Sequence, residues 1–191
     1  MTQSAPLLKQ IEARALDGYL VVSAQAGDRI AYERLARRWD RRLTAHAWRL
    51  TGDMDLARDV AQSAWIEIAR GLAGLRDEAA FPAWVYRIVT RRCAKAIGRR
   101  QQDRVLAHAL ASDAAADPAD TPPADTVAPR LAAAVRSLPA SQRAAVGLFY
   151  FEELSLVETA AALDVPVGTV KTRLMHARRT LRAVLEGESH A

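Results

Sequence analysis

The chain has 191 residues and a formal net charge of +5, with an isoelectric point of about 9.9. This length suits one domain or two small ones, and a basic balance favours a polyanionic partner. The single cysteine, Cys93, excludes an intrachain disulfide and a cysteine-based zinc site. The four histidines show no metal-ligand spacing, no apolar run reaches the ~18–20 residues of a membrane span, and no secretory signal is evident at the start. We therefore expect a cytoplasmic protein that needs no metal or cofactor and does not insert into a membrane.

Alanine dominates the apolar residues, and β-branched residues are sparse, which favours an all-α fold. Residues 1–16 carry no readable pattern and are assigned as an N-terminal tail, which is either a short tail or an extension of the first helix. The next block, residues 17–102, carries helix-start signals at Asp28, at Asp53 or Asp55, and at Pro82, since Asp caps a helix and Pro is tolerated in its first turn. The predicted helices span residues 17–27, 28–51, 53–71 and 81–101.

Residues 103–129 are rich in Ala, Asp and Pro and lack apolar periodicity. Such sequence cannot bury enough surface to offset its ordering entropy, so it predicts a flexible acidic linker. A coil of this length spans roughly 30 Å on average and about 90 Å when taut. The two blocks that it joins could therefore reach separate sites on a long ligand.

The second block, residues 130–186, predicts helices over 131–136 and 139–152, followed by a helix-turn-helix; residues 187–191 form a C-terminal tail. Ser155 and Glu158 fit a capping box at the start of the first helix of that motif. Asp164 ends this helix, because Asp tolerates a left-handed conformation. The second helix of the motif is expected to begin at Gly168 or Thr169.

The last predicted helix has two contrasting faces. At helical spacing, one apolar line is formed by Val170, Leu174, Ala177, Leu181 and Val184. The opposite face carries long polar and cationic side chains, and no acidic residue occurs from 168 to 185. This pattern suits a helix that lies in the major groove of DNA. A solvated basic face on an ordinary C-terminal helix is the alternative.

Several segments resemble a known family. Residues 137–143, 149–155 and 167–179 closely resemble the −35-reading domain of extracytoplasmic-function (ECF) RNA polymerase sigma factors, in the sigma-70 family. Residues 55–65 are similar to the polymerase-docking helix of that family, and residues 81–88 to its −10-reading, strand-opening helix. The resemblance implies an all-α protein of two small domains, sigma domain 2 and sigma domain 4, that directs bacterial RNA polymerase to promoters and is not itself an enzyme.

The resemblance also implies roles for residues of this chain. The residues that the resemblance assigns to polymerase docking are Asp59, Gln62 and Trp65. Recognition and opening of the −10 element fall on Arg76, Trp84, Arg87, Arg91, Arg92, Lys95, Arg99 and Arg100. Reading of the −35 element falls on Thr169, Lys171, Thr172, Arg173, Met175, His176, Arg178 and Arg179. The implied partners are the β′ and β subunits of core RNA polymerase, promoter DNA and an anti-sigma factor.

Other interpretations of the same residues stay open. Trp65 and Trp84 have the spacing of core residues, and Asp59 and Gln62 could be merely solvated. Arg91 and Lys95 stand where the family frequently has Asn and Asp, so a −10 sequence cannot be transferred from it. A stand-alone helix-turn-helix regulator would bind a palindromic site as a dimer, and a helical protein-interaction module would bind no specific DNA. A helical nuclease would require converging carboxylates, which the sequence does not show.

Overall fold

The computed structural model describes the backbone of residues 4–110 and 127–186, and the side chains of residues 8–106 and 131–184. Within these ranges all regular elements are helical, which confirms the predicted all-α fold. The N-terminal block contains α1 (Ser4–Gln25), α2 (Arg29–Thr51), α3 (Met54–Gly71), the short 3₁₀ helices η1 (Leu72–Gly74) and η2 (Glu78–Ala80), and α4 (Phe81–Leu110). The C-terminal block contains α5 (Val127–Ser137), α6 (Ala140–Val146), the π-helical turn η3 (Gly147–Phe151), α7 (Leu156–Leu163) and α8 (Val167–Glu186).

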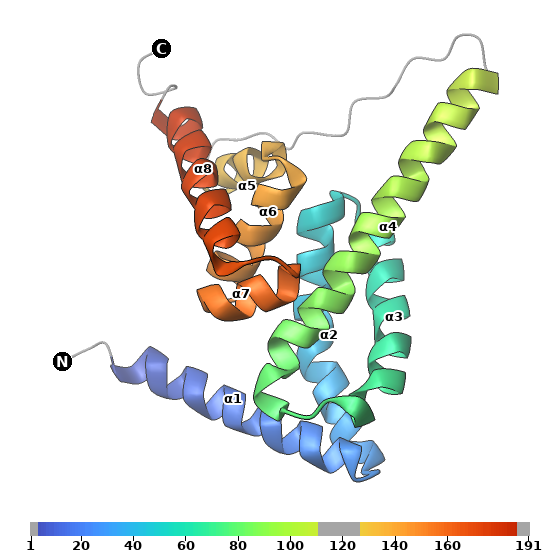
Figure 1. Cartoon of the computed structure of the whole chain (residues 1–191), viewed down its shortest axis with the longest axis vertical. Coiled ribbons are helices and arrows are strands. Elements are labelled where there is room, and N and C mark those ends of the chain that lie inside the picture. Colours follow the sequence, from blue (N-terminus) through green and yellow to red (C-terminus); the bar gives the residue numbers. More distant parts are fainter. Residues whose placement is uncertain (1–3, 111–126, 187–191) are drawn as a thin grey trace.

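The N-terminal block is a bundle in which α2 packs against α1, α3 and α4 (Figure 1). Its helix starts follow the sequence signals: the Asp28 side chain accepts from the N–H groups of Ile30 and Ala31, and the Asp53 side chain accepts from the N–H of Leu56. The centre of the bundle is aromatic. Trp39, which is buried, makes edge-to-face contacts with the rings of Phe81 and Tyr86 at centroid distances of 5.3 and 5.7 Å.

In the C-terminal block, α6 and α7 pack against the apolar side of α8. Val170, Leu174 and Ala177 are buried in a small second core, together with Val135 and Val146. The predicted capping box is present, because Ser155 and Glu158 each bond the other's backbone N–H. Asp164 has φ 55°, ψ 46° and ends α7 in the left-handed conformation, as expected.

Some boundaries differ from those predicted. The first helix begins at Ser4 and not at Asp17, so of the two alternatives for residues 1–16 the structure shows the helix extension. Likewise α4 continues through residues 103–110 and α5 starts at Val127, which shortens the segment assigned to the linker. The reason is local propensity: residues 101–110 contain neither Gly nor Pro, and a good helix former can extend a helix without tertiary support. The remainder of the predicted linker, 111–126, lies outside the described residues.

The helix predicted over 139–152 is interrupted. After α6 the chain widens into η3, where the N–H of Glu152 donates to the carbonyl of Gly147 at 3.1 Å, five residues back. Glu153 then adopts a positive φ of 56°. This turn changes the direction of the chain before α7 and sends the Glu152 side chain out of the C-terminal block.

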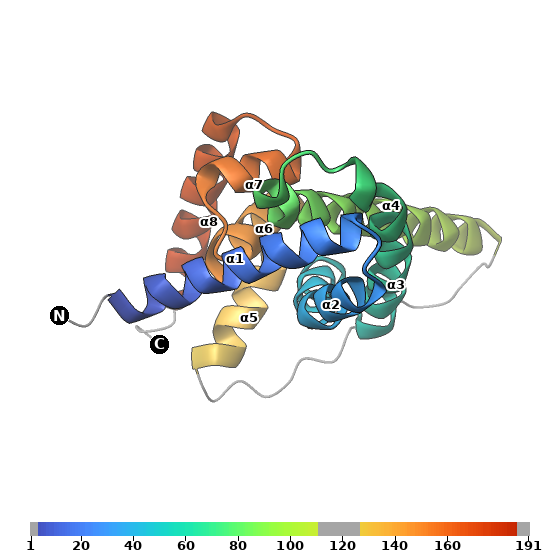
Figure 2. The same ribbon diagram turned by 90° about the horizontal axis from the view of Figure 1, so that it is seen from below.

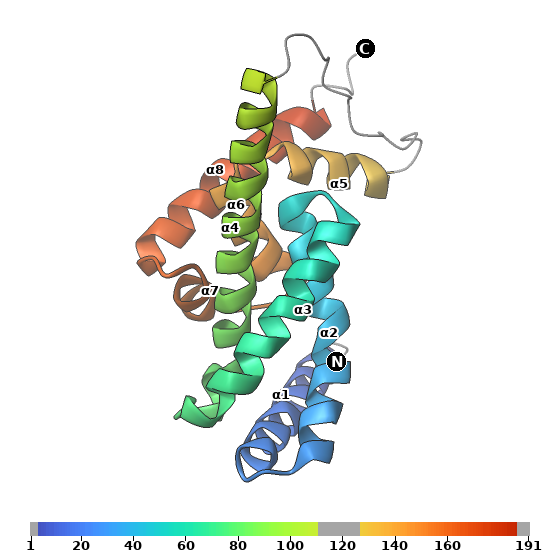
Figure 3. The same ribbon diagram turned by 90° about the vertical axis from the view of Figure 1, so that its right-hand side faces the viewer.

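The two blocks pack against each other. Figure 1 shows the C-terminal helices on one side of α4 and α3 on the other, with α1 crossing below both blocks. Figure 2, seen from below, shows α1 passing in front of both blocks, and Figure 3 shows α4 between α7 and α3. Ala144, Leu148, Leu154 and Ala162 from the C-terminal block are buried in the same core as the bundle residues of the N-terminal block. The described parts therefore share one hydrophobic core across the block boundary, in addition to the small core behind α8.

Candidate nucleic-acid interface

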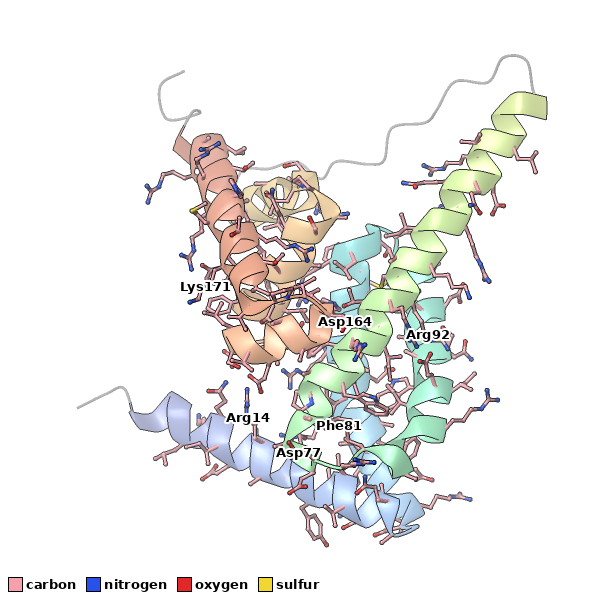
Figure 4. The ribbon with its side chains drawn as sticks, viewed as in Figure 1. Arg14, Asp77, Phe81, Arg92, Asp164 and Lys171 are labelled. Carbon is pink, nitrogen blue, oxygen red and sulfur yellow. The ribbon has the colours of Figure 1, made fainter. Side chains whose placement is uncertain are left out.

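The recognition face predicted on α8 is exposed. Lys171, Thr172, Met175, His176, Arg178 and Arg179 are all exposed, whereas Thr169 and Arg173 are half-buried at the flank. Figure 4 shows Lys171 projecting away from α4 and the N-terminal block. The buried Val170–Leu174–Ala177 line is on the opposite side and fixes the rotation of the helix. The arrangement presents cations and polar groups together, on a helix with no acidic residue between 168 and 185.

Some side chains of this face already have partners. The Arg178 Nε donates to the Tyr150 hydroxyl at 2.5 Å, and its guanidinium lies 5.7 Å from the centroid of that ring. The Thr172 hydroxyl donates to the carbonyl of Gly168 at 3.1 Å. Arg178 is therefore held in one position, as suits a contact that fixes register, whereas Lys171 and Met175 extend from the outer surface.

The basic residues of α4 that the resemblance assigns to the −10 element form a basic track, and carboxylates neutralise part of it. The track consists of Arg87, Arg91, Arg92, Lys95, Arg99 and Arg100. Arg91 and Arg92 both bond Glu67 of α3, Arg92 at 2.8 Å, and Arg100 bonds Asp53. The hydrogen bond from the N–H of Leu56 and the bond from Arg100 lower the pKa of Asp53. Lys95 and Arg99 are exposed and are paired with no carboxylate in the described part of the chain. Because exposed ion pairs contribute little, phosphate oxygens can displace these carboxylates.

Arg87 belongs to the same track but is held by the other block. Its Nη2 lies 3.1 Å from a carboxylate oxygen of Asp164, the residue that ends α7. Figure 4 shows Asp164 beside α4, at the turn that leads into α8. The helix-turn-helix therefore covers part of the helix predicted to read the −10 element.

The loop before α4 is organised by hydrogen bonds. Gln25, at the end of α1, donates from its amide nitrogen to the carbonyls of Leu72 and Leu75 at 2.9 and 2.7 Å. Asp77 accepts from the N–H of Ala79 and begins η2, and Arg76 is exposed. The loop is thus fixed to α1 at two points and presents Arg76 outward.

Trp84 is half-buried and packs against the main core. Its ring lies so close to Gly71 that an added Cβ there would come within 2.9 Å of it. The structure places Trp84 in the wall between α4 and the start of the loop, in line with the core spacing seen in the sequence.

The predicted docking residues are on α3. Asp59 and Gln62 are exposed, and Trp65 is half-buried against the ring of Tyr32, with its indole N–H donating to Asp40 at 3.0 Å. Trp65 therefore braces α3 against α2 and leaves only part of its surface for a partner. The three residues share one helix, but the structure does not bring them together with α8.

Sequence reasoning missed several residues that organise these surfaces. Gln25 fixes the loop, Glu67 and Asp53 pair with the basic track, and Glu152 reaches from the C-terminal block into the N-terminal one. The partners of Glu152 lie 66 to 110 residues away in the sequence, so no local signal could have found it. Among the described residues no cluster of His, Cys, Asp and Glu could hold a metal ion. No described helix has both the length and the apolar character required to cross a membrane.

Two family models match the chain: "Sigma-70 region 2" over residues 35–103 and "Sigma-70, region 4" over residues 129–181. The RNA polymerase sigma-H factor of Pseudomonas aeruginosa is 30% identical over 181 residues, which is 89% of this chain and 94% of that protein. The ECF sigma factor SigM of Mycobacterium tuberculosis is 34% identical over 170 residues, covering 88% of this chain and 84% of the relative. The ECF sigma-E factor of Escherichia coli is 31% identical over 176 residues, covering 86% of this chain and 92% of the relative.

Several solved structures share the fold, and two of them are complexes with a second protein. One is CnrH in complex with the cytosolic domain of CnrY, with a TM-score of 0.67 and 22% identity over 90% of this chain and 98% of that one. The other is the sigma factor RpoE in complex with the anti-sigma factor NepR from Bartonella quintana. Its TM-score is 0.67 and its identity 22%, over 81% of this chain and 96% of that one.

The matches at both ends of the chain define a promoter-specific initiation factor of RNA polymerase. The chain belongs to the ECF sigma factors of the sigma-70 family. A stand-alone regulator and a general interaction module are not favoured, because the match extends over both blocks in the family's order.

Proposed function

We propose that the outer face of α8 reads the −35 element of the promoter through Lys171, Arg173, Met175 and His176, with Arg178 and Arg179 on phosphates. The observation that carries this proposal is the exposed, acid-free face from Lys171 to Arg179, opposite the buried side chains of Val170, Leu174 and Ala177. A helix fixed on one side and cationic on the other meets the requirements of major-groove recognition. Thr169 and Thr172 lie at the start of the helix, where base edges are first approached.

The −10 element would be read and opened by α4 and the loop before it. Arg87, Arg91, Arg92, Lys95, Arg99 and Arg100 would follow the backbone of the separated strand, and Arg76 would stand at the loop. Opening each base-pair step costs about 1.4 kcal/mol, and cations along one strand help to offset this cost. Trp84, half-buried against the core, would support the loop and offer only its free edge to a base.

Core RNA polymerase would bind through α3, with Asp59 and Gln62 making polar contacts beside Trp65. The β′ and β subunits of the core enzyme are the expected partners, and all nucleotide chemistry would take place in that enzyme, in the cytoplasm. The exposure of Asp59 and Gln62 on one helix supports this assignment. Trp65 would contribute mainly by holding α3 in position.

An anti-sigma factor is a further proposed partner, since the CnrH structure is a complex with the cytosolic domain of CnrY and the RpoE structure a complex with the anti-sigma factor NepR. A groove of about 640 Å³ between α5, η3 and α8 supports it. The groove is lined by Leu131, Val135, Val146 and Leu181, with Arg178 at its edge. This composition suits an amphipathic helix that carries an acidic residue.

The test is run-off transcription by bacterial core polymerase, with and without this chain, on a pool of promoter fragments from the source genome. The expected result is a set of transcripts from defined start sites that requires the chain. Asp59→Ala with Gln62→Ala should reduce transcription and retention on immobilised core polymerase together, whereas Glu12→Ala, a change on α1 away from α3, should reduce neither. DNA binding without association with polymerase would contradict the proposal.

A further inference from the structure

The outer face of α1 is apolar although it is exposed to solvent. At helical spacing this face is formed by Leu8, Ile11, Ala15, Tyr19 and Val22, which all lie within about 40° of the direction of Ala15. Ala15 is exposed, and each of the four larger side chains has at least half of its surface exposed. The opposite side of the helix, with Leu20 and Val21 buried, packs against α2. The helix is therefore apolar on two faces, and only one of them is covered.

The charged side chains of α1 lie mostly away from this outer face. Arg14 bonds Glu158 of α7 at 2.6 Å, and Figure 4 shows it pointing from α1 toward that helix. Asp17 is buried. Only Lys9 and Glu12 border the outer face, and their charges sum to zero. A neutral, apolar face does not suit DNA or an anionic membrane surface, because both attract clusters of Lys and Arg.

No described part of the chain covers this face. Figure 1 places α1 below both blocks, and Figure 2, seen from below, shows it in front of them. The segments outside the described backbone, residues 1–3, 111–126 and 187–191, contain no Leu, Ile, Val, Phe, Tyr or Trp that could pack on it. An exposed apolar patch of this kind marks an interaction site, and its occupant must come from another molecule.

The order of the side chains along α1 is complementary to itself. The intervals between the five apolar residues are 3, 4, 4 and 3, so the pattern is the same in both directions from Ala15. When two copies of the helix pack antiparallel about Ala15, Leu8 of one copy meets Val22 of the other, and Ile11 meets Tyr19. Alanine, the smallest of the five, then lies at the two-fold axis, where small side chains let helices approach closely.

The polar group at the edge of the face fits the same arrangement. In the antiparallel register Glu12 of one copy lies across from Tyr19 of the other. Its carboxylate can then accept from the Tyr19 hydroxyl, and the two-fold axis repeats this contact. No like charges meet along the pair of helices, and such matching of a patch with itself is what an isologous dimer requires.

We propose that two copies of this chain associate through the outer faces of α1, packed antiparallel with Ala15 at the axis. This association goes beyond promoter recognition, since it uses neither α3 nor α8. The helix has 22 residues and is about 33 Å long at ~1.5 Å per residue. One helix pair of that length buries less than the roughly 1,200 Å² of the smaller stable interfaces, so the dimer is weak, with a dissociation constant on the order of tens of micromolar.

Sedimentation velocity of the full chain, from about 1 to about 200 µM, brackets this constant. The mass should rise from that of a monomer toward that of a dimer. Ala15→Glu places two carboxylates against each other at the axis and should weaken association more than about tenfold. The matched control is Ala161→Glu, the same change at an exposed alanine of α7, which should leave association unchanged. Circular dichroism checks that both variants are folded.

Crosslinking tests the register of the two helices. A chain with Leu8→Cys and a chain with Val22→Cys, mixed at 100 µM or about that concentration, should be joined by a short bis-maleimide. Neither chain should be joined to its own copy, because like positions lie about 21 Å apart along the antiparallel pair at ~1.5 Å per residue. The native Cys93 is buried, and burial raises its pKa to about 12, so it should not react at neutral pH.

Each contrary result overturns a stated part of the proposal. A dimer that persists in Ala15→Glu would place the association on another surface. Crosslinking of Leu8→Cys to its own copy as fast as to Val22→Cys would exclude the antiparallel register. A chain that stays monomeric throughout would exclude the dimer. If such a chain also sediments with phosphatidylcholine vesicles, and less so after Ala15→Glu, the face belongs to a lipid surface instead.

Discussion

Two cationic helices of this protein, α8 and α4, have similar charge but different surroundings. The cations of α8 from Lys171 to Arg179 lie in a stretch of sequence, 168–185, that contains no acidic residue, and Lys171 projects from the molecule. On α4, by contrast, Arg91, Arg92 and Arg100 are paired with carboxylates of α3, and Arg87 is paired with Asp164 of the other block. The surface proposed to read the −35 element is therefore exposed in this structure, whereas the surface proposed for the −10 element would have to exchange intramolecular partners for DNA.

The largest effect is expected when the apolar packing that holds α8 in place is removed. Leu174 is 2% exposed and lies in the small core behind the recognition face. Leu174→Ala should lower the free energy of unfolding by about 2–5 kcal/mol, through lost burial and the cavity left behind. Urea unfolding followed by circular dichroism measures it. Leu8→Ala, at an exposed apolar residue of α1, is the control, and an equally small effect of both would contradict the packing described here.

Substitutions on the exposed face of α8 should weaken promoter recognition and leave the free energy of unfolding unchanged. Lys171→Ala should weaken −35-dependent initiation by about 1–3 kcal/mol, the usual contribution of one good base contact. Run-off transcription on promoters with intact and scrambled −35 elements measures it, and Lys9→Ala, at another exposed lysine, should be neutral. An equal loss on both kinds of promoter would show that Lys171 contacts only the backbone.

The packing of the two blocks should depend on pH through His46. Its ring is fully buried, bonds the Thr90 hydroxyl at 3.0 Å, contacts the Tyr86 ring at 5.1 Å and lies beside Gly147 of the C-terminal block. Desolvation, together with the nearby Arg49 charge, lowers the pKa of His46 to about 3.

Since the pKa of His46 is lower in the folded chain than in the unfolded one, the neutral ring stabilises the fold above about pH 6.5, and this stability is lost as pH falls toward 3. Between pH 7 and pH 5.5 the free energy of unfolding should drop by about 1 kcal/mol from this group. Urea titrations at both pH values measure the drop, and His46→Gln should reduce it. An unchanged drop in that variant would assign the pH dependence to other groups.

The smallest effect is expected at the carboxylate that neutralises α4. Glu67→Gln should free Arg91 and Arg92 and increase affinity for a fluorescein-labelled twelve-nucleotide poly(dT) strand about two- to threefold, as expected for exposed ion pairs worth less than ~1 kcal/mol. Fluorescence anisotropy at low and high salt measures it. Asp55→Asn, which breaks the exposed pair with Arg58, is the matched control, and equal gains in both variants would indicate a general charge effect.

Local features of the fold were predictable because their signals are local. Asp28, Asp53 and Ser155 cap helices as their sequence context indicates, and Asp164 takes the left-handed conformation that ends α7. The outward face of α8 followed from helical spacing alone. For residues 1–16 the sequence left a tail and a helix extension open, and the structure shows the extension from Ser4.

What could not be predicted depends on tertiary contact. In the sequence nothing distinguishes Glu152 from a surface carboxylate. It is buried only because η3 packs against α2 and α4. The pairing of Glu67 with Arg91 and Arg92 likewise requires that α3 and α4 be neighbours. The family resemblance indicated which helices are expected to contact DNA, but not that the other block covers one of them.

The most direct test places a DNA-cleaving iron chelate on each helix in turn. Met175→Cys on α8 and Ala94→Cys on α4 provide exposed attachment points, since both positions are exposed and the native Cys93 is buried. In a transcribing complex with core polymerase, the account predicts cleavage around −35 from position 175 and around −10 from position 94. Cleavage of the same base pairs from both positions, or no localised cleavage from either, would contradict the assignment of the two helices to separate promoter elements.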